Sequence, residues 1–181
     1  MSKTDKLLKR IIPPPTREER EGFSNQKLLA ELSPQELENV EKGLIEMLAD
    51  QDDFLIGETL VFLNSEWSIP GLRDRLKKAS STFEKIKWVS LVNDLRNGNS
   101  EMEKIAYEEF QKLEFLYEID GIVFMDLIKF DSERINKKIE QFVDHKYFLV
   151  AHHAKMVLNY KGYADNYDKE TVTKKWWEVW K

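Results

Sequence analysis

Cysteine is absent from this chain of 181 residues. Its absence excludes disulfides, thiolate metal sites and a cysteine nucleophile. Glycine and proline are scarce, with 7 and 5 residues, and three of the prolines are consecutive. Because turns between strands usually need these residues, the body of the chain is predicted to contain long helices instead of many short strands.

Long apolar runs are also missing. No run approaches the roughly 20 apolar residues of a membrane-spanning helix. The basic residues near the N-terminus flank only the apolar pairs Leu7-Leu8 and Ile11-Ile12, which are too short for a signal peptide. These absences predict a cytoplasmic protein that has no membrane partner.

Common catalytic motifs are not found. The sequence contains no glycine-rich phosphate loop, no Gly-x-Ser-x-Gly elbow and no kinase signature. His145 and His152 would share one face of the final helix, but no Glu-x-x-His or His-Glu-x-x-His motif accompanies them. We therefore expect no metal, no other cofactor and no catalytic residue, while the question of an enzyme outside these motif classes stays open.

Charge is distributed in blocks of alternating sign. Residues 24–66 carry a net charge of −8, residues 67–99 of +4, residues 100–131 of −6 and residues 132–161 of +3. Stacked layers with these charges would neutralise one another, and the alternative is an acidic ridge that steers a basic partner. The total of −5 argues against binding to nucleic acid, whose phosphates attract basic surfaces.

Helical periodicity is the clearest positive signal. Residues 132–160 contain two apolar stripes at helical spacing, one before and one after a break at Asp144, which predicts an antiparallel pair of helices. Comparable units begin at Ser33, Ile69 and Ser100, so that successive starts are 36, 31 and 32 residues apart. A recurrence of this length, with two helices per unit, is typical of an α-solenoid.

We therefore predict an all-α protein built as a right-handed α-solenoid of about four antiparallel helix pairs. Residues 24–161 would form this repeat domain. Residues 1–23 are predicted to be a flexible N-terminal tail, because prolines 13–15 and a charged run follow a short apolar segment. The alternative is that Leu7, Leu8, Ile11 and Ile12 dock on a partner or on the body of the protein.

Two stretches resemble the corner between the helices of a HEAT repeat. One comprises residues 43–53, and the other comprises residues 88–95 followed by the turn at 97–100 and by Ile105-Ala106. The resemblance covers roughly residues 33–160. It implies a non-catalytic protein–protein interaction scaffold or adaptor. A bacterial toxin-neutralising immunity protein is a special case of this prediction, because a small acidic chain suits a basic toxin.

The HEAT-like alkylpurine DNA glycosylases imply an alternative function. In that family a similar fold hosts chemistry, with aromatic residues and an aspartate in a basic concave groove. The matching candidates in this chain are Trp67, Trp88 and Asp94. The acidic net charge opposes this alternative.

Tryptophan gathers in the C-terminal segment, residues 162–181. Trp176, Trp177 and Trp180 lie within five residues of one another, and such side chains seldom stay in water. They are predicted to fold back and cap the last repeat, or else to dock on a partner. The side chains that would face them lie on the half-apolar side of the final helix and are His145, Leu149, His152, Met156 and Tyr160.

Overall fold

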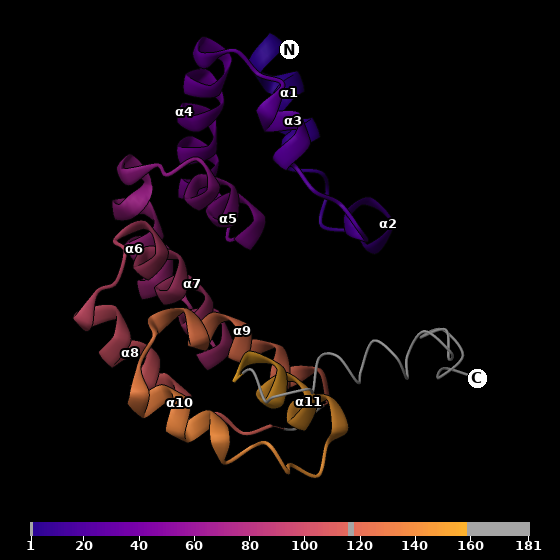
Figure 1. Ribbon diagram of the computed structural model, residues 1–181. Helices are drawn as coiled ribbons and strands as arrows, with labels where there is room; N and C mark the ends of the chain where they lie inside the picture. The colour runs from indigo at the N-terminus through magenta and orange to yellow at the C-terminus, as the bar shows by residue number, and fades with distance from the viewer. Residues whose placement is uncertain (1, 116–117, 159–181) are drawn as a thin grey trace.

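The computed structural model describes residues 2–115 and 118–158 of the chain. Within these ranges every regular element is helical, so the prediction of an all-α fold is confirmed. The helices follow one another from α1 at the N-terminal end to α10 and α11 at the opposite end (Figure 1). The α-helices are α1 (Lys3–Ile11), α2 (Arg17–Arg20), α3 (Gln26–Ala30), α4 (Pro34–Asp50), α5 (Phe54–Phe62), α6 (Ile69–Lys78), α7 (Thr82–Leu95), α8 (Ser100–Phe110), α9 (Phe124–Leu127), α10 (Glu133–Glu140) and α11 (Phe148–Val157), and the short 3-10 helices are η1 (Glu66–Ser68), η2 (Glu118–Val123) and η3 (Ile128–Phe130). No helix in the described ranges has both the length and the apolar character that a membrane crossing requires.

Side-chain caps fix several of the helix starts. Ser33 and Ser81 form capping boxes with the residues three positions later, Glu36 and Glu84. Asp53 caps α5 by accepting a hydrogen bond from a backbone N–H of the first turn at 3.0 Å. Such caps satisfy backbone donors that the first helical turn leaves without partners, so these starts are set by nearby residues alone.

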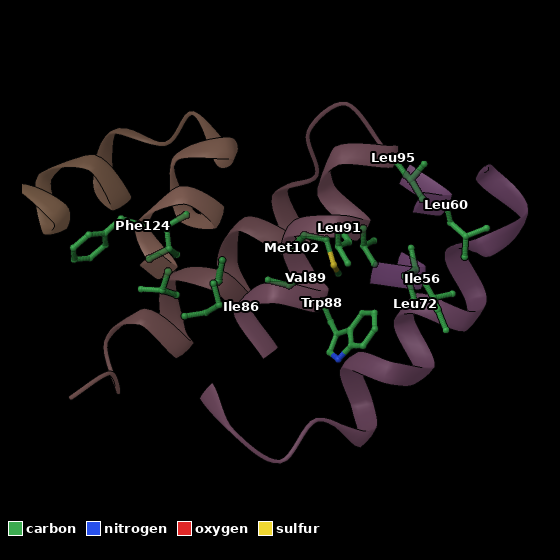
Figure 2. Packing of buried hydrophobic residues seen from close by; sticks show 14 of the residues in the cluster. Ile56, Leu60, Leu72, Ile86, Trp88, Val89, Leu91, Leu95, Met102 and Phe124 are labelled. Atoms are coloured by element: carbon green, nitrogen blue, oxygen red, sulfur yellow. The ribbon is translucent and has the colours of Figure 1, made fainter. Parts of the chain in front are cut away.

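α7 lies at the centre of the hydrophobic core. It contacts α5, α6, α8, α9, η2 and η3, so neighbours cover almost every side of this helix. Trp88 of α7 is 2% exposed, and its ring lies 4.7 Å from the ring of Phe54 in α5, measured between centroids. Even its polar residues Ser90 and Asn93 are buried, as expected of a helix that neighbours surround. Figure 2 shows buried side chains of this region, which include Ile56, Leu60, Leu72, Ile86, Val89, Leu91, Leu95, Met102 and Phe124.

The N-terminal residues form part of the core, in contrast to the flexible tail predicted for residues 1–23. α1 packs on α4, and Ile11 and Ile12 are 1% and 8% exposed. The side chain of Leu8 lies against Gly43 of α4, where an added Cβ would be 2.5 Å from its Cδ1. Prolines 13–15 follow the end of α1 and stop the helix without detaching it from the body. Docking on the body was the alternative prediction for these apolar residues.

The two C-terminal helices differ from the predicted hairpin. α10 ends at Glu140, and residues 141–147 connect it to α11, in place of a short break at Asp144. α11 packs chiefly on η2, and also on α9 and α10. Gly121 of η2 lies so close to α11 that an added Cβ would be 2.7 Å from the Cα of Val150. Packing against η2 therefore positions α11 more than the connection to α10 does.

Arg20 anchors the segment that follows the prolines. Its Nη2 donates to the carbonyl oxygen of Pro13 at 2.7 Å, and its guanidinium forms a bidentate pair with the carboxylate of Asp53. Burial raises the pKa of Asp53, but hydrogen bonds from Arg20 and from the backbone N–H of Leu55 outweigh burial and lower the pKa below its ordinary value. The charged carboxylate therefore joins the N-terminal segment to the start of α5.

Replacing Arg20 by alanine is expected to lower the free energy of unfolding by about 1–3 kcal/mol, because charge-assisted hydrogen bonds to partly buried groups are lost. Arg20→Lys keeps the charge but not the bidentate geometry, so it should recover only part of the loss. The effect should be full above the pKa of an unfolded aspartate, about 3.9, and should fade as the pH falls through the lowered pKa of the folded protein. Urea unfolding at neutral and at strongly acidic pH measures both quantities, and an equal loss under both conditions would contradict the ion pair.

Candidate functional site

The corner between α5 and α6 exposes two large aromatic side chains. Phe62, the last residue of α5, is 51% exposed, and Trp67 of η1 is 83% exposed. Asn64 takes a positive φ of 53°, which turns the chain at the end of α5. The hydroxyl of buried Ser68 donates to the carbonyl oxygen of Ser65 at 2.7 Å. Local hydrogen bonding therefore holds the backbone of this α5–α6 corner, residues 62–68, while its two rings face solvent.

Trp67 lines a hollow of about 600 Å³, which we call the Trp67 hollow. The other lining residues are Glu41 from α4 and Leu63, Asn64 and Glu66 from the α5–α6 corner. Among the described residues neither glutamate forms a salt bridge, and the nearby Lys42 is paired with Glu38 at 2.6 Å instead. The hydrogen bond that Lys42 donates to Glu38 raises the pKa of Lys42, and the charge of Glu41 also acts on Lys42 and helps to raise this pKa. The hollow thus combines an exposed indole with two carboxylates that form no salt bridge in the described part of the chain.

Phe62 borders a second hollow, of about 450 Å³. The N-terminal segment, α5, α7 and η3 meet there, and the side-chain amide of Asn25 donates to the hydroxyl of Thr59 at 2.6 Å. This bond ties the N-terminal segment to α5 and closes one side of the hollow. The lining residues besides Phe62 are Phe23, Ser24, Asn25, Gln26, Leu55, Glu58, Thr59, Val61, Leu91, Asp94 and Lys129.

The charged groups near this second hollow are paired in one network. Lys87 of α7 contacts Glu58 of α5 at 2.6 Å and Asp126 of α9 at 3.2 Å. Lys129 of η3 contacts Asp126 at 3.4 Å and Asp94 of α7 at 3.0 Å. Burial lowers the pKa of Lys87, but the charges of Asp126 and Glu58 outweigh burial and raise the pKa above its ordinary value. These five side chains, the Lys87 network, thus form one chain of contacts in which acidic and basic groups alternate.

The ion pairs join blocks of opposite charge. Lys87 belongs to the basic block 67–99, whereas both of its partners belong to acidic blocks. Two further pairs follow the same rule, Arg73 with Glu101 at 2.7 Å and Arg134 with Glu103 at 2.9 Å. Salt bridges between these blocks thus pair some of their opposite charges. The two carboxylates of the Trp67 hollow, those of Glu41 and Glu66, take no part in these salt bridges.

The three residues considered for a glycosylase-like site are not brought together. Trp67 lines the first hollow and Asp94 the second, where Asp94 is paired with Lys129. Trp88 belongs to the core and borders a separate hollow of about 110 Å³. No group of three His, Asp or Glu side chains among the described residues could hold a metal ion.

The predicted binding side of the final helix is largely covered. His152 is 8% exposed, and its pKa is lowered by burial and by the neighbouring His153, so its imidazole is neutral at pH 7. His145 is half-buried, with its ring 5.9 Å from that of Phe115 and 6.0 Å from that of Phe142. Both histidines therefore pack against neighbouring side chains of the C-terminal part of the fold, and their role in binding stays a prediction.

The remaining predicted site residues on this side give a mixed result. Leu149 and Met156 are half-buried, while the neighbouring Phe148 is 59% exposed. Tyr160, Trp176, Trp177 and Trp180 lie outside the described residues. Their capping or docking role therefore stays a prediction.

Sequence reasoning did not identify the α5–α6 corner as a surface for binding. Phe62 falls within a strongly apolar helix, which predicts burial and hides its exposure. Glu41 and Glu66 look like ordinary members of an acidic block. The signal that could have found the site was Trp67, an aromatic residue in a connecting segment outside every apolar stripe.

Comparison with known proteins adds one partial likeness. No family model matches the chain, and no solved structure matches it significantly. The trigger factor of Onion yellows phytoplasma (strain OY-M) is 26% identical to this chain over 145 residues. The aligned region covers 78% of this chain but only 33% of that trigger factor, so the chain spans about a third of its relative's length. At this level the likeness assigns neither a family nor an activity.

Proposed function

We propose that this protein is a non-catalytic scaffold that binds another protein with a basic surface, and that the α5–α6 corner is the docking site. The main support for this proposal is that Trp67 is 83% exposed and lines a hollow together with Glu41 and Glu66. Large aromatic residues dominate the energy of protein–protein interfaces, and clustered carboxylates attract basic partners. A basic toxin would satisfy the same requirement, so an immunity protein remains one form of this proposal.

The arrangement of the helices supports an α-solenoid as the scaffold. Besides contacts between consecutive helices, α4 contacts α6, α5 contacts α7, and α7 contacts α9. Contacts between every second helix are typical of stacked helix pairs, in which each unit packs on the next. Solenoids of this kind serve as binding surfaces in many proteins, which agrees with a docking role.

The glycosylase alternative has less support. Its three candidate residues line three different hollows, and Asp94 is neutralised by Lys129 at 3.0 Å. A groove for DNA would need a basic lining, whereas Glu41 and Glu66 line the Trp67 hollow. We therefore favour binding of a protein over chemistry on DNA.

Affinity capture from the source organism tests the proposal. The double variant Phe62→Ala and Trp67→Ala should reduce recovery of a basic partner by about tenfold or more, as expected when interface anchors are truncated. Phe148→Ala is the matched control, because this ring is similarly exposed, at 59%, but lies on α11. The partner is then purified and its affinity measured for each variant. Equal affinity for the wild type and the double variant would refute docking at this corner.

A further inference from the structure

Elsewhere in the fold, an arginine side chain is bound by the same kinds of group that line the Trp67 hollow, an aromatic ring and a carboxylate. The guanidinium of Arg134 lies over the ring of Tyr107, 4.7 Å from its centroid. The Nε of Arg134 also donates to the carboxylate of Glu103 at 2.9 Å. An aromatic face and a carboxylate on α8 thus hold one guanidinium from α10. This trio shows how the chain itself binds an arginine side chain.

The Trp67 hollow has an aromatic ring and carboxylates as well, but no arginine among its described lining residues. It offers the indole of Trp67 and the carboxylates of Glu41 and Glu66. Cations of the described residues lie over the rings of Tyr107, Phe110, Phe142 and Tyr147, but none lies over that of Trp67. Indole is the aromatic group with the strongest attraction for cations. The lining of the hollow contains no lysine or arginine from the described chain.

Charge decides between the ligands that such a hollow could take. An anionic ligand would be repelled by the two carboxylates. A purely apolar ligand would cover the indole but would strip water from Glu41 and Glu66 without replacing it, which costs free energy. A guanidinium satisfies both parts at once, because its flat face stacks on a ring while its N–H groups pair with carboxylates. Lysine lacks the flat face, so arginine fits this geometry better.

We infer that the Trp67 hollow binds an arginine side chain from a basic segment of the partner protein, with the guanidinium stacked on Trp67 and paired with Glu41 and Glu66. This inference rests on the proposed function, since it names the chemistry through which the docking site recognises its partner. It also assigns separate tasks to the two carboxylates and the ring. The carboxylates attract the basic segment, and the indole selects for the planar cation.

The test uses the full-length protein and a fluorescein-labelled peptide in which arginine alternates with glycine. Fluorescence anisotropy at low ionic strength should show binding to the wild type. Trp67→Ala should weaken it by about threefold to tenfold, the range expected for loss of a cation–aromatic contact. Glu41→Gln combined with Glu66→Gln should weaken binding and reduce its dependence on salt. A peptide with citrulline in place of arginine has nearly the same shape without the charge and should bind more weakly than the arginine peptide.

Two controls separate binding from folding. Phe148→Ala should bind the arginine peptide like the wild type, because its ring lies on α11, outside the hollow. Thermal melts should show that the Trp67 and glutamate variants fold normally, as the 83% exposure of Trp67 leads us to expect. Equal binding of the citrulline peptide, or unchanged binding by Trp67→Ala, would overturn the inference.

The remaining outcomes distinguish the inference from the proposed function. In one outcome the wild type does not bind the peptide, but Trp67→Ala still abolishes capture of the natural partner. The inference about arginine then fails, while the docking site at the α5–α6 corner is supported. If capture of the partner is independent of Trp67, the docking site itself fails. If the peptide binds only after residues 174–181 are deleted, the C-terminal segment of the chain is the occupant, which overturns recognition of a separate protein.

Discussion

Replacing Trp88 by alanine is expected to lower the free energy of unfolding by about 3–5 kcal/mol, the usual range for truncating a large buried ring. The side chain is 2% exposed and packs on Phe54 of α5. It also lies against Gly57, where an added Cβ would be 2.9 Å from its ring. Because α7 contacts helices on both sides of it, neighbouring side chains are held in place and cannot easily fill the cavity.

The matched control for this prediction is the same substitution at Trp67. Because Trp67 is 83% exposed, it buries little surface against its own chain, so Trp67→Ala should change the free energy of unfolding by less than about 0.5 kcal/mol. Urea unfolding followed by circular dichroism measures both variants on one scale. A Trp88 variant as stable as the wild type would contradict the central position of α7. A large loss for Trp67→Ala would show that this ring supports the fold.

The second large effect is expected from Gly121→Ala, which should cost about 1–3 kcal/mol through overpacking. The new Cβ would lie 2.7 Å from the Cα of Val150 and 3.1 Å from the carbonyl oxygen of Leu149. Both are backbone positions of α11, so no side chain can rotate away and η2 must separate from α11. Thermal unfolding measures the loss, and faster amide hydrogen exchange in α11 would locate it.

Gly71→Ala is the control for this substitution. At Gly71 the nearest atom to an added Cβ is the Cδ2 of Leu48, at 3.0 Å. That atom is the end of a side chain and can shift by a few tenths of an ångström. Alanine also favours helix over glycine by about 0.8–1 kcal/mol, which offsets the crowding in α6. A Gly121 variant that melts like the Gly71 variant would contradict the close contact between η2 and α11.

Local features of the fold were predictable from sequence. The caps at Ser33, Asp53 and Ser81 depend on side chains within three residues of the helix start, so a short stretch of sequence contains all the needed information. The periodic stripes that follow these caps have the same advantage. The all-α class followed from these stripes, because they repeat along most of the chain.

Features that depend on distant residues were not predictable. The docking of α1 depends on a missing side chain at Gly43 of α4, and prolines 13–15 suggested a detached tail. The position of α11 depends on Gly121 of η2. Sequence alone does not distinguish a glycine needed for close packing from a glycine needed for a turn. The role of Gly43 and Gly121 is therefore visible only in the packed structure.

The candidate site illustrates the same limit. Trp67 and Trp88 are the same residue type, only 21 positions apart, yet one is 83% exposed and the other 2%. Apolar residues surround Trp88 in sequence, but nothing in the sequence shows what covers Trp67. The absence of salt bridges at Glu41 and Glu66 among the described residues is also invisible in sequence, because it depends on where every basic side chain lies.

The Lys87 network has a consequence for how this chain could lengthen or shorten in evolution. Lys87 separates Glu58 from Asp126, at 2.6 Å and 3.2 Å, and the blocks to which these residues belong alternate in sign along the chain. Losing one interior block would make two blocks of like charge neighbours, and like charges repel. Losing two adjacent blocks would restore the alternation. Inherited insertions and deletions of whole blocks within the chain should therefore be tolerated in even numbers and selected against in odd numbers.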